Sequence, residues 1–533
     1  MFVFTLQGLA ICTFSLVGTL LVVYISERKG LTSISDKVLF LLFHLAVASS
    51  VWGLAAPKIG NSITTFRLSL LFFFFFYIYI QIKKKINLFQ GMQLYHWILW
   101  ILFSFMILYG LVTVIFLSAN RSYTFSRLLN LCFDLLFCMA IVLYTRKQCR
   151  IFKSLMINLT VTLGFQFLVS IYECFAGPVY TDTHLGSVGP GFFGLFNFHL
   201  PSVSTFNTND LSASLFFMGM PVIVFWANKL LSRSSKRMSS AIIMAIFTAQ
   251  WFVSYCGGAI IVQIGVLLFF AVISLFVVWW TYKEKNGIAL MIIVVPIIVA
   301  VVLQISPFFS LNSRKGAVSS GSSAASSFTA VSPSNFLFEE TFESVASSSS
   351  SSQVDFPKAM EQEKPDVQVG KVEGFSGWGV GSDEVMKKTV NIRITLLKFA
   401  FNTFIDNPLG VGLGNTQKLA EKNIASQTNG ISKLHCYGAE CIADFGFVFL
   451  TLGVLFVISL LNQARKAVKN IIKTGEPSKL WLVVLSIVML PSAVFLSTAP
   501  GCAQDLMAMW MFLAIFIVMI EQISNMANTN EVF

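Results

Sequence analysis

The sequence predicts an all-α protein that crosses a membrane many times, and three observations point to this fold class. Hydrophobic residues make up 56% of the 533 residues and charged residues only 12%, which excludes a water-soluble domain of this size. Apolar runs of about 18 residues or more recur along the chain, and each can cross roughly 30 Å of hydrocarbon. The runs are rich in aromatic residues and lack the alternation of barrel strands, so helices must satisfy their backbone groups.

About 12 to 13 spans are expected from these runs. They lie near 4–24, 38–56, 66–82, 95–117, 127–145, 154–175, 211–228, 240–254, 260–281, 287–305, 445–463, 480–497 and 507–524. The first run has neither a basic leader nor an A-x-A end. It is therefore expected to remain in the protein as a span rather than to be cleaved as a signal peptide.

The distribution of charge predicts the orientation of the chain and argues against nucleic acid as a partner. The formal net charge is +12, but the basic clusters fall in every second loop between the expected spans. Cytoplasmic loops of membrane proteins are enriched in Lys and Arg, so these loops are expected to be cytoplasmic and the N-terminus outside. The clusters are Arg28 and Lys29; Lys83, Lys84 and Lys85; Arg146, Lys147, Arg150 and Lys153; Lys229, Arg233, Lys236 and Arg237; Lys283 and Lys285; and Arg465, Lys466, Lys469 and Lys473.

The chain is expected to divide into three parts. Residues 1–305 form an N-terminal transmembrane bundle, 306–444 a large extracytoplasmic loop, and 445–533 the C-terminal transmembrane spans. Within the loop, 315–352 is rich in Ser and Ala, a composition that cannot bury a core, so a disordered tether is expected there. Residues 385–444 are expected to hold an amphipathic helix followed by the catalytic segment.

The expected helix of the loop covers 385–406. Leu397, Phe401 and Ile405 recur at helical spacing, and Pro408 disfavours continuation of the helix. An amphipathic helix with this apolar flank is expected to lie at the outer face of the membrane.

The motif GVGLGN places Gly410, Gly412 and Gly414 at alternate positions. A glycine-rich turn can cradle a phosphate, but the dinucleotide-binding version follows a strand and opens a helix. No strand is expected before this motif and no helix clearly starts from it, so a tight turn is the simpler interpretation. Glycines would also let the backbone come close to a ligand.

His435 is the candidate general base. Glu440 and Asp444 follow it at helical distance, and a histidine beside a carboxylate suits proton transfer near neutral pH. The alternative is an interfacial helix with ordinary capping charges. Arg393 and Lys398 are outward cations that could hold a pyrophosphate, or could simply extend toward the membrane interface.

No metal and no nucleotide cofactor are expected. The sequence has no DxD motif, no pair of histidines at i and i+4, no Cys-x-x-Cys pair among its nine cysteines, and no Walker sequence.

The spacing of these motifs resembles that of the O-antigen polymerase and O-antigen ligase superfamily. Arg393 precedes Pro408 by fifteen residues, PLGVGLGN follows, and His435 leads into Asp444 and Gly446 at the start of a span. Upstream, STFNTNDLSASL at 204–215 is similar to a second segment of that family, with Asn207, Asn209 and Asp210 as the matching residues.

The sequence departs from the family pattern at four places. Cys436 stands where the family has Asn, Asp444 where it has Glu, and Thr208 where it has Pro. At 254–258, SYCGG lacks the arginine that the family often carries at this turn. Candidates to replace that phosphate contact are Arg314, Lys387 and Lys388.

The resemblance implies a metal-independent membrane glycosyltransferase with a fold of the C type. Its donor would be a polyprenyl-pyrophosphate-linked oligosaccharide on the outer face of the bacterial plasma membrane, with membrane lipid, a flippase and chain-length regulators as partners. His435, Arg393 and Glu440 would be catalytic. The residues implied to bind substrate are Asn207, Asn209, Asp210, Lys398, Arg314, Gly412, Gly414 and Asp444.

The favoured expectation is a polymerase of lipid-linked repeat units for a capsule, exopolysaccharide or O-antigen type of polymer. A first alternative keeps the chemistry but changes the acceptor, as in a ligase that attaches finished glycan to another molecule. A second alternative is a flippase or other transporter, which would carry charged residues within its spans. Asp134 and Glu173 are the main residues of that kind.

Overall fold

The structure is a computed structural model. It describes residues 6–52, 58–59, 63–118, 120–146, 148–176, 188–189, 198–199, 208–231, 383–434, 436–473, 479–497 and 507–526, together with short stretches between 238 and 279. The described helices are α1 (Leu6–Glu27), α2 (Ile34–Trp52), α3 (Thr65–Lys83), α4 (Leu94–Val112), α5 (Arg121–Thr145), α6 (Cys149–Ala176), α7 (Thr208–Leu231), α11 (Asp383–Asp406), α12 (Asn415–Asn423), α13 (Tyr437–Lys473), α14 (Leu480–Leu496) and α15 (Met507–Met526). Two short antiparallel pairs, β1 (Lys58–Ile59) with β2 (Ile63–Thr64) and β3 (Val188–Gly189) with β4 (Phe198–His199), complete the described elements.

The expectation of a helical protein with many spans is confirmed. Within the described residues, nine helices are long and apolar enough to cross a membrane, as judged by length and composition. They are α1 to α7, α13 and α15, and α14 adds a shorter apolar helix. The expected spans 240–254 and 260–281 lie mostly outside the described residues, and the expected span 287–305 and the expected tether at 315–352 lie outside them entirely.

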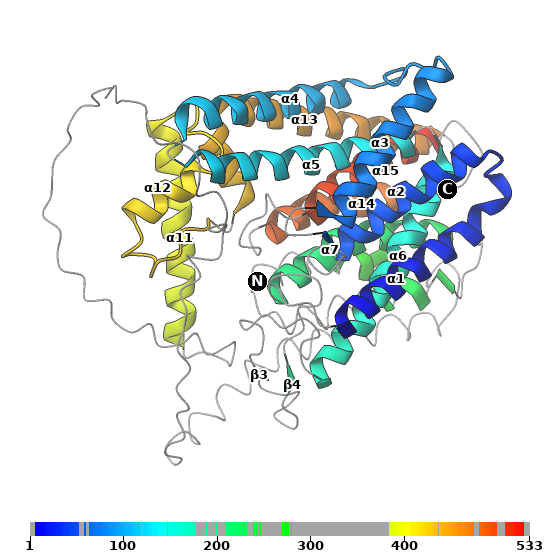
Figure 1. Cartoon of the computed structure of the whole chain (residues 1–533), viewed down its shortest axis with the longest axis horizontal. Helices are drawn as coiled ribbons and strands as arrows, with labels where there is room; N and C mark the ends of the chain where they lie inside the picture. Colours follow the sequence, from blue (N-terminus) through cyan, green and yellow to red (C-terminus); the bar gives the residue numbers. More distant parts are fainter. Residues whose placement is uncertain are drawn as a thin grey trace, which may run out of the picture.

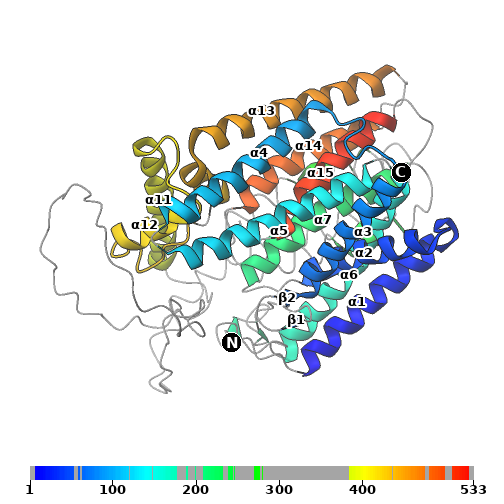
Figure 2. The same ribbon diagram turned by 45° about the horizontal axis from the view of Figure 1, so that its top comes forward.

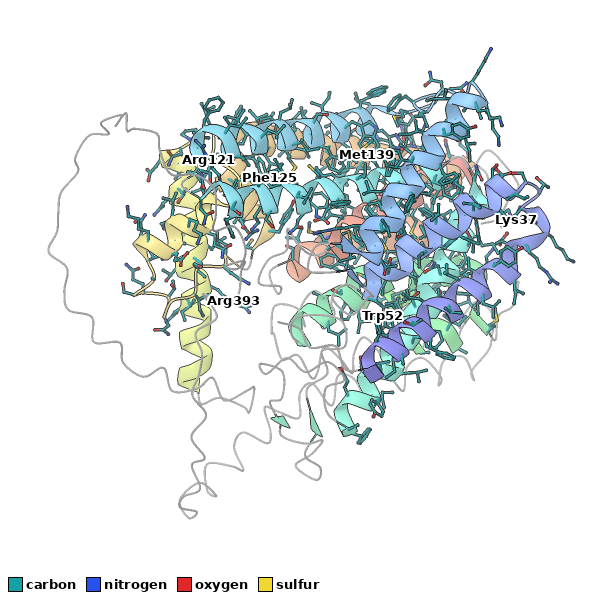
Figure 3. All side chains as sticks on the ribbon, in the orientation of Figure 1. Lys37, Trp52, Arg121, Phe125, Met139 and Arg393 are labelled. Carbon is teal, nitrogen blue, oxygen red and sulfur yellow. The ribbon has the colours of Figure 1, made fainter. Side chains whose placement is uncertain are left out.

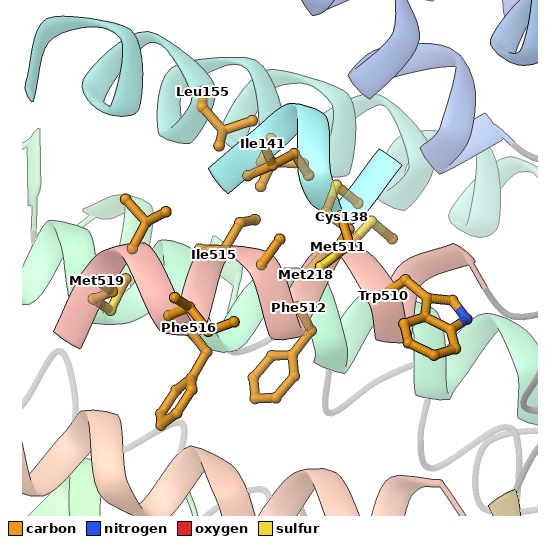
Figure 4. Packing of buried hydrophobic residues seen from close by; sticks show 14 of the residues in the cluster. Cys138, Ile141, Leu155, Met218, Trp510, Met511, Phe512, Ile515, Phe516 and Met519 are labelled. Atoms are coloured by element: carbon orange, nitrogen blue, oxygen red, sulfur yellow. The ribbon is translucent and has the colours of Figure 1, made fainter. Parts of the chain in front are cut away.

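Helix α15 lies at the centre of the bundle. The protein buries 83% of the apolar segment of α15, against 33% of that of α4. Helix α15 packs against α5, α7 and α13. Figure 4 shows Met511 and Ile515 of α15 among Cys138 and Ile141 of α5 and Met218 of α7. Lipid tails are as apolar as these side chains, so close van der Waals packing rather than escape from water holds such helices together.

The basic loops between the described helices gather at one end of the bundle. The basic ends of α1, α3, α5 and α13 gather at one end, near Lys37, whereas Arg121 and Arg393 lie at the other (Figure 3). The basic loops that the structure describes therefore share one side, as the alternating pattern of charge in the sequence predicts.

Helix α11 lies across the second end of the bundle, at a large angle to α4 and α5 (Figures 1 and 2). The helix expected over 385–406 is present as α11, and it ends at Asp406, two residues before Pro408. One of its faces packs inward through Leu396 and Ala400, which are 0% and 1% exposed. These residues contact α12 and the first turns of α13.

The opposite face of α11 is apolar and exposed. Ile394, Leu397, Phe401 and Ile405 are between 45% and 62% exposed, and Leu409 beyond the helix end is 74% exposed. An exposed apolar stripe on a helix across the end of a transmembrane bundle is typical of a helix seated in the lipid interface.

We therefore expect Phe401 to touch lipid. With p-benzoylphenylalanine in place of Phe401, irradiation in membranes should attach phospholipid to the protein. The matched control carries the same photoreactive residue in place of Asn402, which is exposed and lies about 100° further around the helix. Equal lipid attachment at both positions, or attachment to protein alone at 401, would show that α11 does not rest on the bilayer by this stripe.

Candidate functional site

The candidate site lies where α4, α5, α12 and the first turns of α13 meet, beside α11 (Figures 1 and 2). One sequence expectation fails here. No helix was expected to start from GVGLGN, yet α12 begins at Asn415, directly after Gly414. The helix is only 9 residues long and polar, so it lacks the apolar periodicity that predicts longer helices.

The three glycines of GVGLGN are required by backbone conformation and by close packing. Gly410, Gly412 and Gly414 have φ of +90°, +99° and +75°, a region that residues with a Cβ rarely adopt. A Cβ on Gly410 would also lie 2.4 Å from the carbonyl oxygen of Asp444, and one on Gly412 would lie 2.6 Å from Cγ2 of Thr113. The glycines thus let this turn press against α4 and α13.

The carboxylate of Asp444 fills the cradle that the turn and α12 form. Its Oδ2 accepts the backbone N–H of Gly414 at 2.8 Å, and its Oδ1 accepts the N–H and the hydroxyl of Thr416 at 3.1 and 2.6 Å. Asp444 is 0% exposed. A helix N-terminus with free N–H groups attracts anions, and here the protein supplies its own. Gly414 and Asp444 thus hold each other, and their expected contact with substrate stays a prediction.

Helix α13 breaks at Gly446 to receive the turn. Gly446 has φ +71° and ψ −158°, which interrupts the helix. The carbonyl of Ala443 accepts the N–H of Val411 at 3.0 Å, and the carbonyl of Asp444 accepts the N–H of Gly412 at 2.9 Å. The N–H of Phe447 in turn donates to the carbonyl of Pro408 at 2.7 Å. Backbone bonds within α13 are thus exchanged for bonds to the turn, which satisfies the buried polar groups. The backbone N–H of Gly412 is therefore used in the contact between the turn and α13.

The end of α4 holds the other side of the turn. The hydroxyl of Tyr109 lies 2.9 Å from the carbonyl oxygens of both Leu409 and Gly410 and can donate to either. The hydroxyl of Thr113 accepts the N–H of Leu413 at 3.3 Å. Thr113 opens a short π-helical segment, Thr113–Leu117, and such segments are frequent where helices meet functional sites.

Arg127 of α5 is the main residue that the sequence analysis missed. Its Nη2 donates to Oε1 of Gln417 in α12 at 2.5 Å, and its Nη1 lies 3.7 Å from Oε1 of Glu440 in α13. Arg127 and Glu440 are only 7% and 3% exposed. The sequence feature that could have identified Arg127 is its position as a cation at the edge of an apolar run. Ionisable residues at membrane depth are costly and tend to be functional.

The exposed surface of the site is rich in cations. Lys398, Lys418, Lys422 and Lys433 are exposed, and Lys418 pairs with Glu421 at 3.0 Å. Arg393 on α11 is half-buried, and this burial lowers its pKa from the ordinary value. Its guanidinium nevertheless remains protonated throughout the physiological range. This surface suits a substrate that carries negative charge.

The expected site residues fall into three groups, and the first is Arg393 and Lys398 on α11, as described above. Gly412, Gly414, Glu440 and Asp444 converge on α12 and the start of α13, as the contacts above show. His435, Asn207 and Arg314 lie outside the described residues, as does SYCGG at 254–258. The side chains of Asn209, Asp210, Lys387 and Lys388 are likewise not described. The convergence of Arg393 and His435 on one cavity stays a prediction.

The described part of the chain contains no group of three or more His, Cys, Asp or Glu side chains that could hold a metal ion. The sequence matches no model of a known protein family and no curated protein sequence at a significant level.

Proposed function

We propose that this chain is a glycosyltransferase that polymerises polyprenyl-pyrophosphate-linked oligosaccharide repeat units for a bacterial surface polysaccharide. The observation that carries the proposal is the order Arg393, PLGVGLGN, His435 and Asp444, on a segment whose turn is bonded to α4 and α13. Such anchoring can hold a reactive group still relative to a lipid-linked substrate, and precise placement supplies much of the rate of a group-transfer enzyme.

The proposed chemistry needs one base and one cation. The imidazole of His435 takes the proton of an acceptor hydroxyl, and that oxygen forms a bond to the anomeric carbon of the donor sugar. The bond from the anomeric carbon to the pyrophosphate oxygen breaks, and its electron pair leaves with the polyprenyl pyrophosphate. Arg393 stabilises the charge that develops on this leaving group.

The reaction is proposed for the outer face of the bacterial plasma membrane. The described basic loops lie at the end of the bundle opposite α11 (Figure 3), and cytoplasmic loops are the ones enriched in Lys and Arg. The apolar stripe of α11 would then rest in the outer leaflet, where the polyprenyl chain of a donor is held.

Replacement of His435 by alanine tests the proposal. Loss of a general base costs about 10²- to 10⁴-fold in rate, so cells with His435→Ala should carry short polymer or single repeat units, as seen by gel analysis of the glycan. The matched control is Ser426→Ala, an exposed and uncharged residue of the same segment, which should leave chain length unchanged. Polymer of normal length in cells that express His435→Ala stably would refute the proposed chemistry.

The acceptor distinguishes polymerase from ligase. Purified protein incubated with its own lipid-linked repeat unit should produce lengthened lipid-linked chains. Transfer of glycan only to a different lipid or protein acceptor would indicate the ligase alternative. Movement of the lipid-linked sugar across vesicles without any joining would indicate a transporter.

A further inference from the structure

We infer that Arg127 is a positioning residue that holds, from within the transmembrane bundle, both ends of the segment carrying His435. This inference rests on the proposed function. The segment runs from α12 to α13, that is, from residue 424 to 436. Arg127 bonds to Gln417 in α12 and pairs with Glu440 in the first turn of α13. One guanidinium on α5 therefore fixes the elements on both sides of the proposed base.

The guanidinium is fixed in direction as well as in place. Its Nε donates to the hydroxyl of Tyr123 at 3.1 Å, and that hydroxyl donates to the same Oε1 of Gln417 at 3.0 Å. The ring of Tyr123 lies under Lys418 of α12, with Nζ 5.1 Å from the ring centroid. Arg127 thus belongs to a small network that ties α5 to α12 by hydrogen bonds and a cation–π contact.

Burial makes this network sensitive to the loss of its cation. Glu440 is 3% exposed and Arg127 is 7% exposed, so water screens their attraction little. If the guanidinium is removed, Glu440 loses a cation while still buried, which strongly destabilises such pairs. This geometry gives Glu440, expected from the sequence to be catalytic, a structural role as well. It is the anchor through which Arg127 holds the start of α13.

The test combines glycosyl transfer with amide hydrogen exchange. Arg127→Gln should lower kcat for chain extension about 10- to 100-fold, since small displacements far from the chemistry can cost that much. KM for the lipid-linked repeat should stay within about twofold, because Arg127 is 7% exposed and is proposed to act through α12 and α13 rather than on substrate. Exchange in residues 415–436 should become faster. Arg127→Lys should lower kcat and speed exchange less than Arg127→Gln does, because lysine keeps the positive charge but lacks the several N–H donors of the guanidinium.

Two further variants make the test specific. Glu440→Gln should produce a similar loss, and combining it with Arg127→Gln should add little, as expected for groups that act together. Arg121→Gln, an exposed arginine in the first turn of the same helix, should leave transfer and exchange unchanged.

The possible outcomes distinguish the positioning role of Arg127 from the proposed glycosyltransferase function. Unchanged exchange in residues 415–436 of Arg127→Gln would overturn the positioning role, whatever the activity. Faster exchange in that variant, together with no glycosyl transfer by the parent protein, would support the positioning role and refute the proposed function. If Arg127→Gln fails to fold, the comparison is made with Arg127→Lys, where exchange and kcat equal to the parent would overturn the inference.

Discussion

Replacing Gly446 by alanine is expected to prevent the GVGLGN turn from docking on the transmembrane helices. A Cβ at this position would lie 2.3 Å from the carbonyl carbon of Leu409 and 2.5 Å from the backbone of Gly410 and Pro408. These are backbone atoms, so no side chain can move aside. The φ of +71° with ψ −158° is in addition nearly restricted to glycine. Strain and clash together should cost at least about 3 kcal/mol.

Thermal unfolding in detergent measures this effect, and the chain offers two controls. Gly453 lies in the same helix, and a Cβ there meets nothing within 4 Å, so Gly453→Ala should be neutral or stabilising by up to about 1 kcal/mol. Gly430 has φ +77° with nothing within 4 Å, so Gly430→Ala measures the cost of a positive φ without a clash. A Gly446→Ala protein that melts like Gly453→Ala would contradict the docking seen here.

Asp444→Asn is expected to release α12 from α13. Asparagine has nearly the same shape as aspartate, but it carries an NH₂ group in place of one carboxylate oxygen. Where Oδ2 now accepts the backbone N–H of Gly414, that NH₂ group would face a second donor. Two opposed donors in a fully buried place leave at least one hydrogen bond unmade. The expected loss of stability is about 2 to 4 kcal/mol. If the proposed function holds, glycosyl transfer should also be lost, because the turn no longer holds its position.

Hydrogen exchange in residues 414–423 reads out this loss directly, and exchange there should approach that of an unfolded segment. Asp406→Asn is the matched control, because Asp406 is an exposed carboxylate at the end of α11. Asp444→Glu introduces the residue found here in the superfamily that the sequence resembles. The extra methylene of glutamate in a closed site should cost about 1 to 3 kcal/mol of stability. We therefore expect Asp444→Glu to be destabilised less than Asp444→Asn. Parent-like exchange in Asp444→Asn would show that the carboxylate does not cap α12.

Local sequence patterns determined the spans and the amphipathic helix. Each described span coincides with an apolar run, because a backbone in lipid must satisfy its own polar groups and a helix does so within one segment. Helix α11 followed from the spacing of Leu397, Phe401 and Ile405, since a face buried or seated in lipid repeats with the period of the helix. The common side of the basic loops followed from alternation of charge along the chain.

The tertiary structure alone decided what the polar groups of the candidate site do. The carboxylate of Asp444 caps α12, and Arg127 joins Gln417 and Glu440 from a helix about 300 residues earlier in the chain. A polar contact between distant segments leaves no periodic trace in the sequence, because one residue on each side is enough to make it. Its partner is chosen by which helices the bundle brings together, and in a buried place an unpaired group is too costly to keep.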